Sequence, residues 1–113
     1  MAPREAVYAL LAAAGLAATW YFNLVHVRAG GSFLDLRAVL GLAFANPISS
    51  SFSADLFVAF AGFVVFAIAE ARRIGMRRGW LYPLLGLTLA FAFAFPLFLF
   101  ARERHLRMQG ARR

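Results

Sequence analysis

Apolar residues in this chain run in long stretches that are separated by short groups of charged side chains. The first stretch, residues 6–27, and the third, residues 80–101, contain no charged residue. The second, about residues 52–71, has Asp55 near its start and Glu70 near its end. A bilayer core about 30 Å thick is crossed by about 20 mostly apolar residues of a helix. The pattern therefore predicts three transmembrane helices over these ranges.

The third stretch contains an alternation of alanine and phenylalanine, residues 90–95, that is also typical of a strand. A lone strand cannot satisfy its backbone hydrogen bonds in hydrocarbon, so a helix is predicted there. Pro83 falls in the first turn of that helix, where it costs little, whereas Pro96 is interior and removes a bond to the carbonyl of Ala92. We expect a kink over residues 92–96.

The segment between the first two spans predicts a short amphipathic helix. Over residues 33–45, apolar side chains fall on one helical face and charged side chains elsewhere, which is typical of a helix lying in the membrane interface. Asn46 and Pro47 are expected to end it, because the residue before a proline is disfavoured in helical conformation.

Polar residues at the start of the second span predict its cap. Ser51 or Ser53 is expected to cap the helix, and Asp55 is expected in its first turn, near the positive end of the helix dipole. The alternative is that Asp55 is a functional intramembrane carboxylate, because acidic groups at membrane depth usually have a purpose.

Glu70 is the second acidic candidate, and it cannot act together with Asp55 within one chain. Fifteen residues along one helix separate two side chains by about 22 Å, whereas paired catalytic carboxylates stand within about 10 Å. Glu70 precedes Arg73 by three residues near the end of the span, so an interfacial ion pair is predicted, with a buried partner for Glu70 as the alternative.

Composition supports a membrane protein and excludes several kinds of chemistry. The chain has 113 residues, of which 63% are hydrophobic and 16% aromatic, which leaves too few polar side chains to cover a soluble globule. The fold class predicted is an all-α integral membrane protein with a single domain, residues 1–113. Cysteine is missing from the sequence, which excludes disulfides, thiolate metal sites and thiol catalysis. We predict no cofactor and no metal.

Asn23 and His26 are the remaining polar candidates. They are spaced i and i+3 near the end of the first span, where they could hold a ligand or a polar headgroup. One histidine does not make a metal site, so a partly solvated interfacial pair is predicted, with a ligand or headgroup site as the alternative.

All twelve basic residues are arginine, and their distribution gives no clear orientation to three spans. Four lie in the loop of residues 72–78 and five in a basic tail, residues 102–113, which a single span would place on opposite sides of the membrane. We expect an amino terminus inside, the chain ends on opposite sides, and a tail that contacts headgroups or an acidic partner. No nucleic-acid partner is predicted, because the arginines lack a compact basic domain and stacking aromatics.

A family resemblance rests on several motifs within about two thirds of the chain. These are Asn46 with Pro47, Asp55, the segment of residues 70–75, Trp80 with Tyr82, Pro96 with Leu97, and Arg102 with Glu103. The chain resembles a family of short, three-span bacterial and cyanobacterial membrane proteins that contain a domain of unknown function. The resemblance implies a multi-pass protein of a bacterial cell membrane, and it supplies no catalytic residue.

Three classes of function fit these features. The first is a structural or accessory subunit that packs against itself, as a homo-oligomer, or against a larger membrane complex; small residues at four-residue spacing, Ala9, Ala13 and Ala17, favour it. The second is an enzyme acting on a lipid or isoprenoid, and the third is a small transporter built from antiparallel copies. A transport site usually needs an ionisable group near the bilayer midplane, which these spans lack. A protein that is not an enzyme is favoured.

Overall fold

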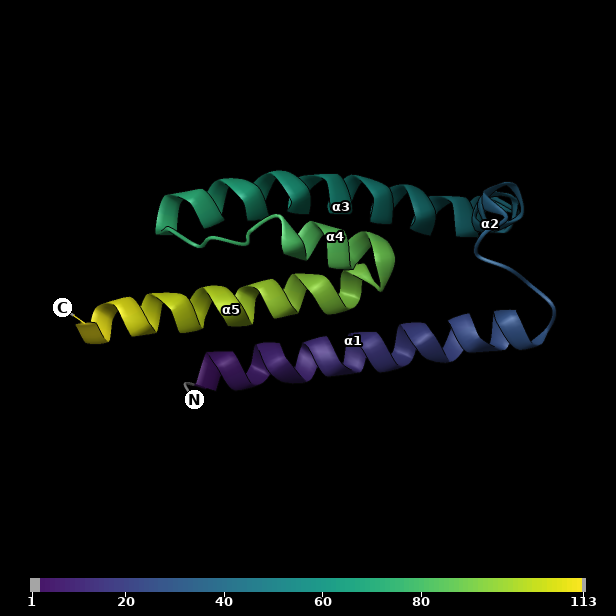
Figure 1. The fold of residues 1–113 in the computed structure, drawn as a ribbon. Helices are drawn as coiled ribbons and strands as arrows, with labels where there is room; N and C mark the ends of the chain where they lie inside the picture. Colours follow the sequence, from purple (N-terminus) through teal and green to yellow (C-terminus); the bar gives the residue numbers. More distant parts are fainter. Residues whose placement is uncertain (1–2, 113) are drawn as a thin grey trace.

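Helices make up the fold in the computed structural model, which describes residues 3–112. In order they are α1 (Pro3–Arg28), α2 (Leu36–Ala43), α3 (Pro47–Ile74), α4 (Leu81–Thr88) and α5 (Phe91–Arg112) (Figure 1). The residues so described contain no strand, so the all-α prediction is confirmed, including the helix over most of the alanine and phenylalanine repeat.

Helix α3 begins at Pro47 rather than near residue 52, because Asn46 supplies a complete cap. The Asn46 side-chain oxygen accepts from the Ser49 amide at 2.8 Å, and the Ser49 hydroxyl accepts from the Asn46 amide at 3.2 Å. Pro47 occupies the first helical position, where its missing N–H costs nothing. The prediction that Asp55 lies in the first turn is therefore wrong, since Asp55 lies in the third turn.

The predicted cap at Ser51 or Ser53 is also wrong, and Ser53 has a different role. Its hydroxyl donates to the carbonyl of Ala43 at 2.8 Å, which fixes the end of α2 on the side of α3. The Phe44 ring stacks on Phe57 at 6.1 Å beside this bond. Helix α2 is shorter than the predicted residues 33–45, because Asp35 caps it by accepting from the Ala38 amide at 3.2 Å.

The third apolar stretch is two helices instead of one. Tyr82 of α4 lies 5.3 Å from Phe98 of α5, ring to ring, and a Cβ on Gly86 would lie 3.5 Å from the Cβ of Ala94. The second pair is closer together in the sequence than the first, as expected for an antiparallel hairpin. This hairpin is visible in green and yellow in Figure 1. The predicted span over residues 80–101 is therefore corrected.

The chain reverses at Leu89 and Ala90, where three hydrogen bonds satisfy backbone groups. The amides of Leu89 and Ala90 both donate to the carbonyl of Leu85, at 2.8 and 3.2 Å. The Trp20 indole of α1 donates to the carbonyl of Leu89 at 3.2 Å. The change in direction thus lies before the expected kink over residues 92–96, and α5 continues as one helix through Pro96.

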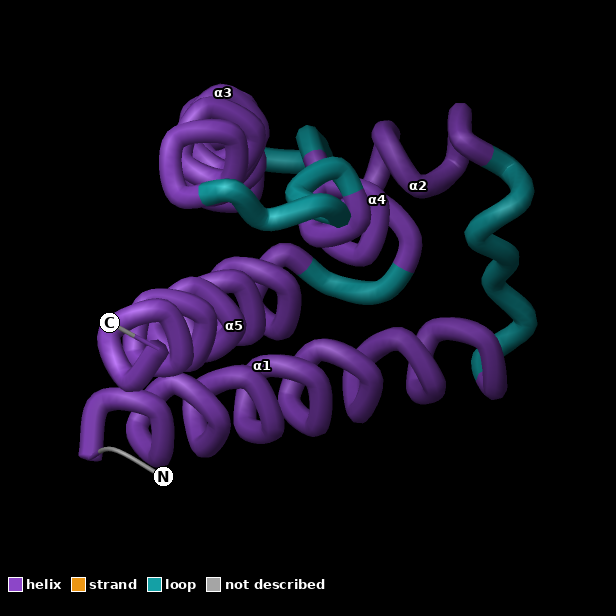
Figure 2. Tube along the Cα trace, turned by 60° about the vertical axis from the view of Figure 1, so that its left-hand side comes forward, coloured by secondary structure: helices purple, strands orange, loops and turns teal. Residues whose placement is uncertain are grey.

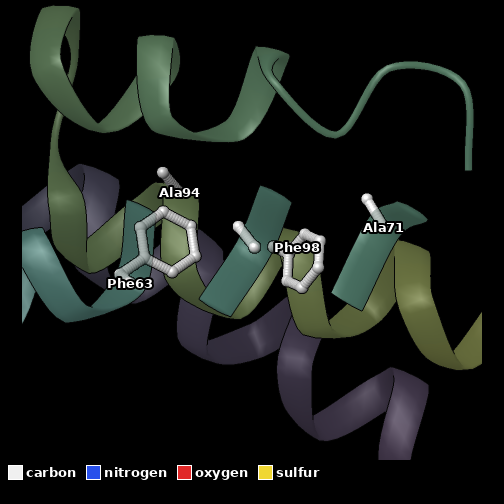
Figure 3. Packing of buried hydrophobic residues seen from close by; sticks show 5 residues of the cluster. Phe63, Ala71, Ala94 and Phe98 are labelled. Carbon is white, nitrogen blue, oxygen red and sulfur yellow. The ribbon is translucent and has the colours of Figure 1, made fainter. Parts of the chain in front are cut away.

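The hydrophobic core lies between α3 and the hairpin. Phe63 and Phe98 are almost fully buried, and three alanines, Ala67, Ala71 and Ala94, complete the cluster (Figure 3). The Phe63 ring also lies within 6.0 Å of the rings of three phenylalanines of α5, at positions 91, 95 and 98. The hairpin therefore turns these three rings toward α3.

Helix α1 packs against α5 through small residues. A Cβ on Gly15 would collide with the carbonyl of Ala92, so the two backbones lie in direct contact. Ala12 is buried at this contact, whereas Ala13 and Ala17 are exposed. Two members of the small-residue strip expected on α1, Ala13 and Ala17, therefore lie outside the interface, whereas Ala90 and Ala94 of the hairpin are buried.

Both ends of the described chain lie at the same end of a molecule that measures 53 × 24 × 24 Å (Figures 1 and 2). The expectation of chain ends on opposite sides is thus wrong, because the hairpin brings the end of α5 back beside the start of α1. Two helices, α1 and α3, are long and apolar enough to cross a membrane, in place of the three predicted. With eight residues, α4 is about 12 Å long and too short to cross.

Candidate functional site

The end of the molecule that holds both chain ends also holds most of its charge. Glu70 accepts from Arg73 one helical turn later, at 2.8 and 2.5 Å, and from Arg102 of α5 at 2.9 Å. Arg102 also donates to Glu103 at 3.0 Å. The predicted pair of Glu70 with Arg73 is confirmed, and the bond to Arg102 adds a link between α3 and α5 that helical spacing alone could not predict.

A second ion pair joins α1 to α5. Arg107 Nε donates to Glu5 at 2.7 Å, and the Glu5 side chain is only 1% exposed. The hydrogen bond to Glu5 raises the pKa of Arg107, which favours the charged form of this side chain. Sequence reasoning missed Glu5. The available signal was an acidic residue next to a long apolar stretch in a chain with an excess of arginine.

The end of α3 is held by two side chains of α5. The carbonyl of Ile74 accepts from Gln109 at 3.1 Å and from His105 Nε2 at 2.7 Å, and the latter bond requires a hydrogen on Nε2 because a carbonyl can only accept. Gly75 then leaves the helix with φ +80°, a left-handed conformation that favours glycine. The basic tail is thus helical over residues 102–112, and His105 is half-buried.

A groove of about 810 Å³ opens beside these contacts. Its walls are the segment from Gly75 to Leu85, which includes α4, and the part of α5 from Leu97 to Gln109. Three exposed arginines line it, Arg77, Arg78 and Arg104. The groove combines a cationic part with apolar walls, which suits an amphiphilic anion better than a polar metabolite.

The other predicted site residues lie away from this end. Asp55 is exposed in the half of α3 that is nearer to α2. Asn23 and His26 lie in the last turns of α1, and no hydrogen bond joins their side chains. The His26 ring instead lies 5.1 Å from Phe33, and its Nε2 is buried without a hydrogen-bond partner in residues 3–112. Within the same residues, no group of three or more His, Cys, Asp or Glu side chains could hold a metal ion.

Comparison with known proteins places the chain in a family. No curated protein and no solved structure matches it. One family model, described as a protein of unknown function, DUF2834, matches residues 7–104. This match covers four of the five helices almost completely and includes the ion pairs of Glu70. The chain therefore belongs to the family of unknown function DUF2834.

Proposed function

We propose that this chain is a multi-pass protein of the cell membrane that serves as a structural or accessory subunit. The observation that carries the proposal is the large apolar surface of its two longest helices. Leu10, Tyr21 and Phe22 of α1 are exposed, as are Val58 and Val65 of α3. Water would penalise such a surface by about 25 cal/mol for each Å², whereas lipid tails or a partner helix would cover it at no cost.

The distribution of arginine supports a specific orientation. Between residues 3 and 112, nine of the eleven arginines lie at the end that holds both chain ends, and the other two, Arg28 and Arg37, lie toward the opposite end. The nine are Arg4, Arg72, Arg73, Arg77, Arg78, Arg102, Arg104, Arg107 and Arg112. Arginine is concentrated on the cytoplasmic side of membrane proteins. Helices α1 and α3 then cross the membrane, while the α4–α5 hairpin enters from the cytoplasmic side and returns to it.

A role as a subunit is supported by how little of the surface of α1 and α3 is covered by the other helices. Among the described helices, α1 packs only against α5, and α3 packs against α2 and the hairpin. Ala13 and Ala17 form an exposed strip on α1 that would allow another helix to approach closely. An open face of this kind suits a chain that assembles with a second copy or with a larger complex.

Two measurements test the proposal. The full-length protein should stay in the membrane pellet after extraction with alkaline carbonate, which releases peripheral proteins. Native mass spectrometry in a mild detergent should then give a mass above the 12.4 kDa of one chain. Ala13→Leu with Ala17→Leu should reduce that assembly, whereas Val58→Leu with Val65→Leu on α3 should not. Release by carbonate, or a single chain throughout, would contradict the proposal.

A further inference from the structure

The groove at the charged end has an excess of positive charge that the protein itself does not neutralise. The three carboxylates at this end, Glu5, Glu70 and Glu103, are held by Arg73, Arg102 and Arg107. Within residues 3–112, no carboxylate pairs with the three arginines of the groove, Arg77, Arg78 and Arg104. Arginines that line one groove and have no carboxylate partner form a site for an anion from outside the chain.

The two walls of the groove change character in the same direction. Moving away from the hairpin turn, α4 presents Leu85 and Leu81 before the chain reaches Arg78 and Arg77. The α5 wall likewise presents Leu97, Phe100 and Ala101 before it reaches Arg104. Because α4 and α5 are antiparallel, the apolar parts face each other and so do the cationic parts. The groove is therefore amphipathic along its length.

His105 and Gln109 also line the groove, and the Nε2 atom of each is already hydrogen-bonded within the protein. Both side chains bond to the carbonyl of Ile74, so they fix the wall and leave the arginines to bind the anion. Arginine suits a phosphate because its planar group donates two parallel hydrogen bonds to two oxygens. The volume of about 810 Å³ is large enough for a headgroup, its glycerol and the first part of an acyl chain.

We propose that this groove binds one anionic phospholipid, with its phosphate among Arg77, Arg78 and Arg104 and its acyl chains along Leu81, Leu85 and Leu97. The inference rests on the membrane placement proposed above, which sets the arginines at headgroup level and the leucines in the hydrocarbon. Basic pockets on the cytoplasmic side of membrane proteins bind anionic headgroups in this way. A zwitterionic lipid fits less well, because its own cation would face the same arginines.

The test compares lipids that differ only in their headgroup. The full-length protein is purified in a mild detergent and titrated with phosphatidylglycerol or with phosphatidylcholine of the same acyl chains, and native mass spectrometry counts the lipid retained. We expect one tightly held phosphatidylglycerol per chain and no comparable phosphatidylcholine. Replacing Arg77, Arg78 and Arg104 together by Gln should weaken phosphatidylglycerol binding about 100-fold, at about fivefold for each arginine.

A second triple variant removes the same charge elsewhere and serves as the control. Arg4→Gln, Arg28→Gln and Arg72→Gln change exposed arginines that do not line the groove, and should leave phosphatidylglycerol binding within about threefold of wild type. Equal losses in the two variants would show a diffuse charge effect and overturn the proposal. Equal retention of the two lipids by the wild type would overturn it as well.

Glycerol phosphate, a water-soluble anion with the same phosphate chemistry, separates a lipid site from a phosphate site. We expect that it fails to displace phosphatidylglycerol, because it makes no contact with the apolar walls. Displacement at a similar concentration would overturn the lipid assignment. Carbonate extraction of the same variants keeps this test distinct from that of the proposed function. A protein that stays in the membrane but does not discriminate between the two lipids would contradict lipid binding in the groove and leave the membrane placement intact.

Discussion

Glu5 and Arg107 lie 102 positions apart in the chain and form an ion pair of 2.7 Å that holds the start of α1 on the end of α5. The two partners differ in exposure, because the Glu5 side chain is 1% exposed and that of Arg107 is 47% exposed. Water can replace a lost partner for Arg107 but cannot easily do so for Glu5. The effect of a substitution should therefore depend on which partner is removed.

We expect Arg107→Gln to lower the melting temperature in detergent more than Glu5→Gln does. The first change removes a cationic partner from a carboxylate that is only 1% exposed, whereas the second leaves a guanidinium that reaches solvent. Arg72→Gln is the control, because Arg72 is exposed, forms no ion pair within residues 3–112 and does not line the groove, so this variant should melt like the wild type. An equal or larger loss for Glu5→Gln would contradict this reading of the pair.

Two glycines within long helices give a second test at the residue scale. A Cβ on Gly15 would collide with the carbonyl of Ala92, whereas a Cβ on Gly62 would meet nothing within 4 Å. The same substitution should then act in opposite directions. Gly15→Ala should destabilise by about 1–3 kcal/mol by forcing α1 and α5 apart, and Gly62→Ala should be neutral or stabilise by up to about 1 kcal/mol. The melting temperatures of the two variants test this prediction. A Gly15→Ala variant as stable as the wild type would mean that the two backbones are not in contact.

The α4–α5 hairpin is the element that differs most from the sequence prediction. An engineered disulfide can test it, because the sequence has no cysteine of its own. Gly86 and Ala94 would have Cβ atoms 3.5 Å apart, at the short end of the range for a disulfide. In one continuous helix, eight residues would separate the same positions by about 12 Å.

We expect Gly86→Cys with Ala94→Cys to form an intrachain disulfide on mild oxidation, once the ring of Phe60 shifts to admit the new side chain. Mass spectrometry after blocking of free thiols with a maleimide measures it. Gly62→Cys with Ala94→Cys is the control pair and should keep both thiols free, since nothing lies within 4 Å of a Cβ on Gly62. Free thiols in the Gly86 and Ala94 pair would show that the segment does not turn back.

Sequence alone predicted the helices well and the hairpin not at all. Helix content follows from apolar run length, and the pair of Glu70 with Arg73 follows from helical spacing. Nothing between Trp80 and Ala101 is polar enough to mark a turn at Leu89, because that turn is satisfied by Leu85 and by the distant Trp20. The start of α3 was misplaced since an Asn–Pro pair can end one helix and begin the next, and here Asn46 caps α3.

At the scale of the whole molecule, the hairpin explains why the arginines give no clear orientation to three spans. With three spans, the arginines of residues 72–78 and those of residues 102–113 lie on opposite sides, which contradicts the usual asymmetry. With two spans and a hairpin, the described arginines of both groups lie at the same end of the molecule, and three of them, Arg77, Arg78 and Arg104, line the groove. The charge-free part of α1 between Glu5 and Arg28 measures about 33 Å, close to the thickness of a bilayer core. The lack of a clear orientation for three spans is thus an argument against a third span.

The sidedness of three single cysteines tests this account most directly. Ser32→Cys lies between α1 and α2, Arg77→Cys between α3 and α4, and Gly110→Cys near the end of α5. Each variant is labelled in intact cells and in inverted vesicles with a maleimide that does not cross membranes. The account predicts that Arg77→Cys and Gly110→Cys react only in inverted vesicles and Ser32→Cys only in intact cells. Labelling of Gly110→Cys from the same side as Ser32→Cys, with Arg77→Cys on the other, would establish three spans and contradict it.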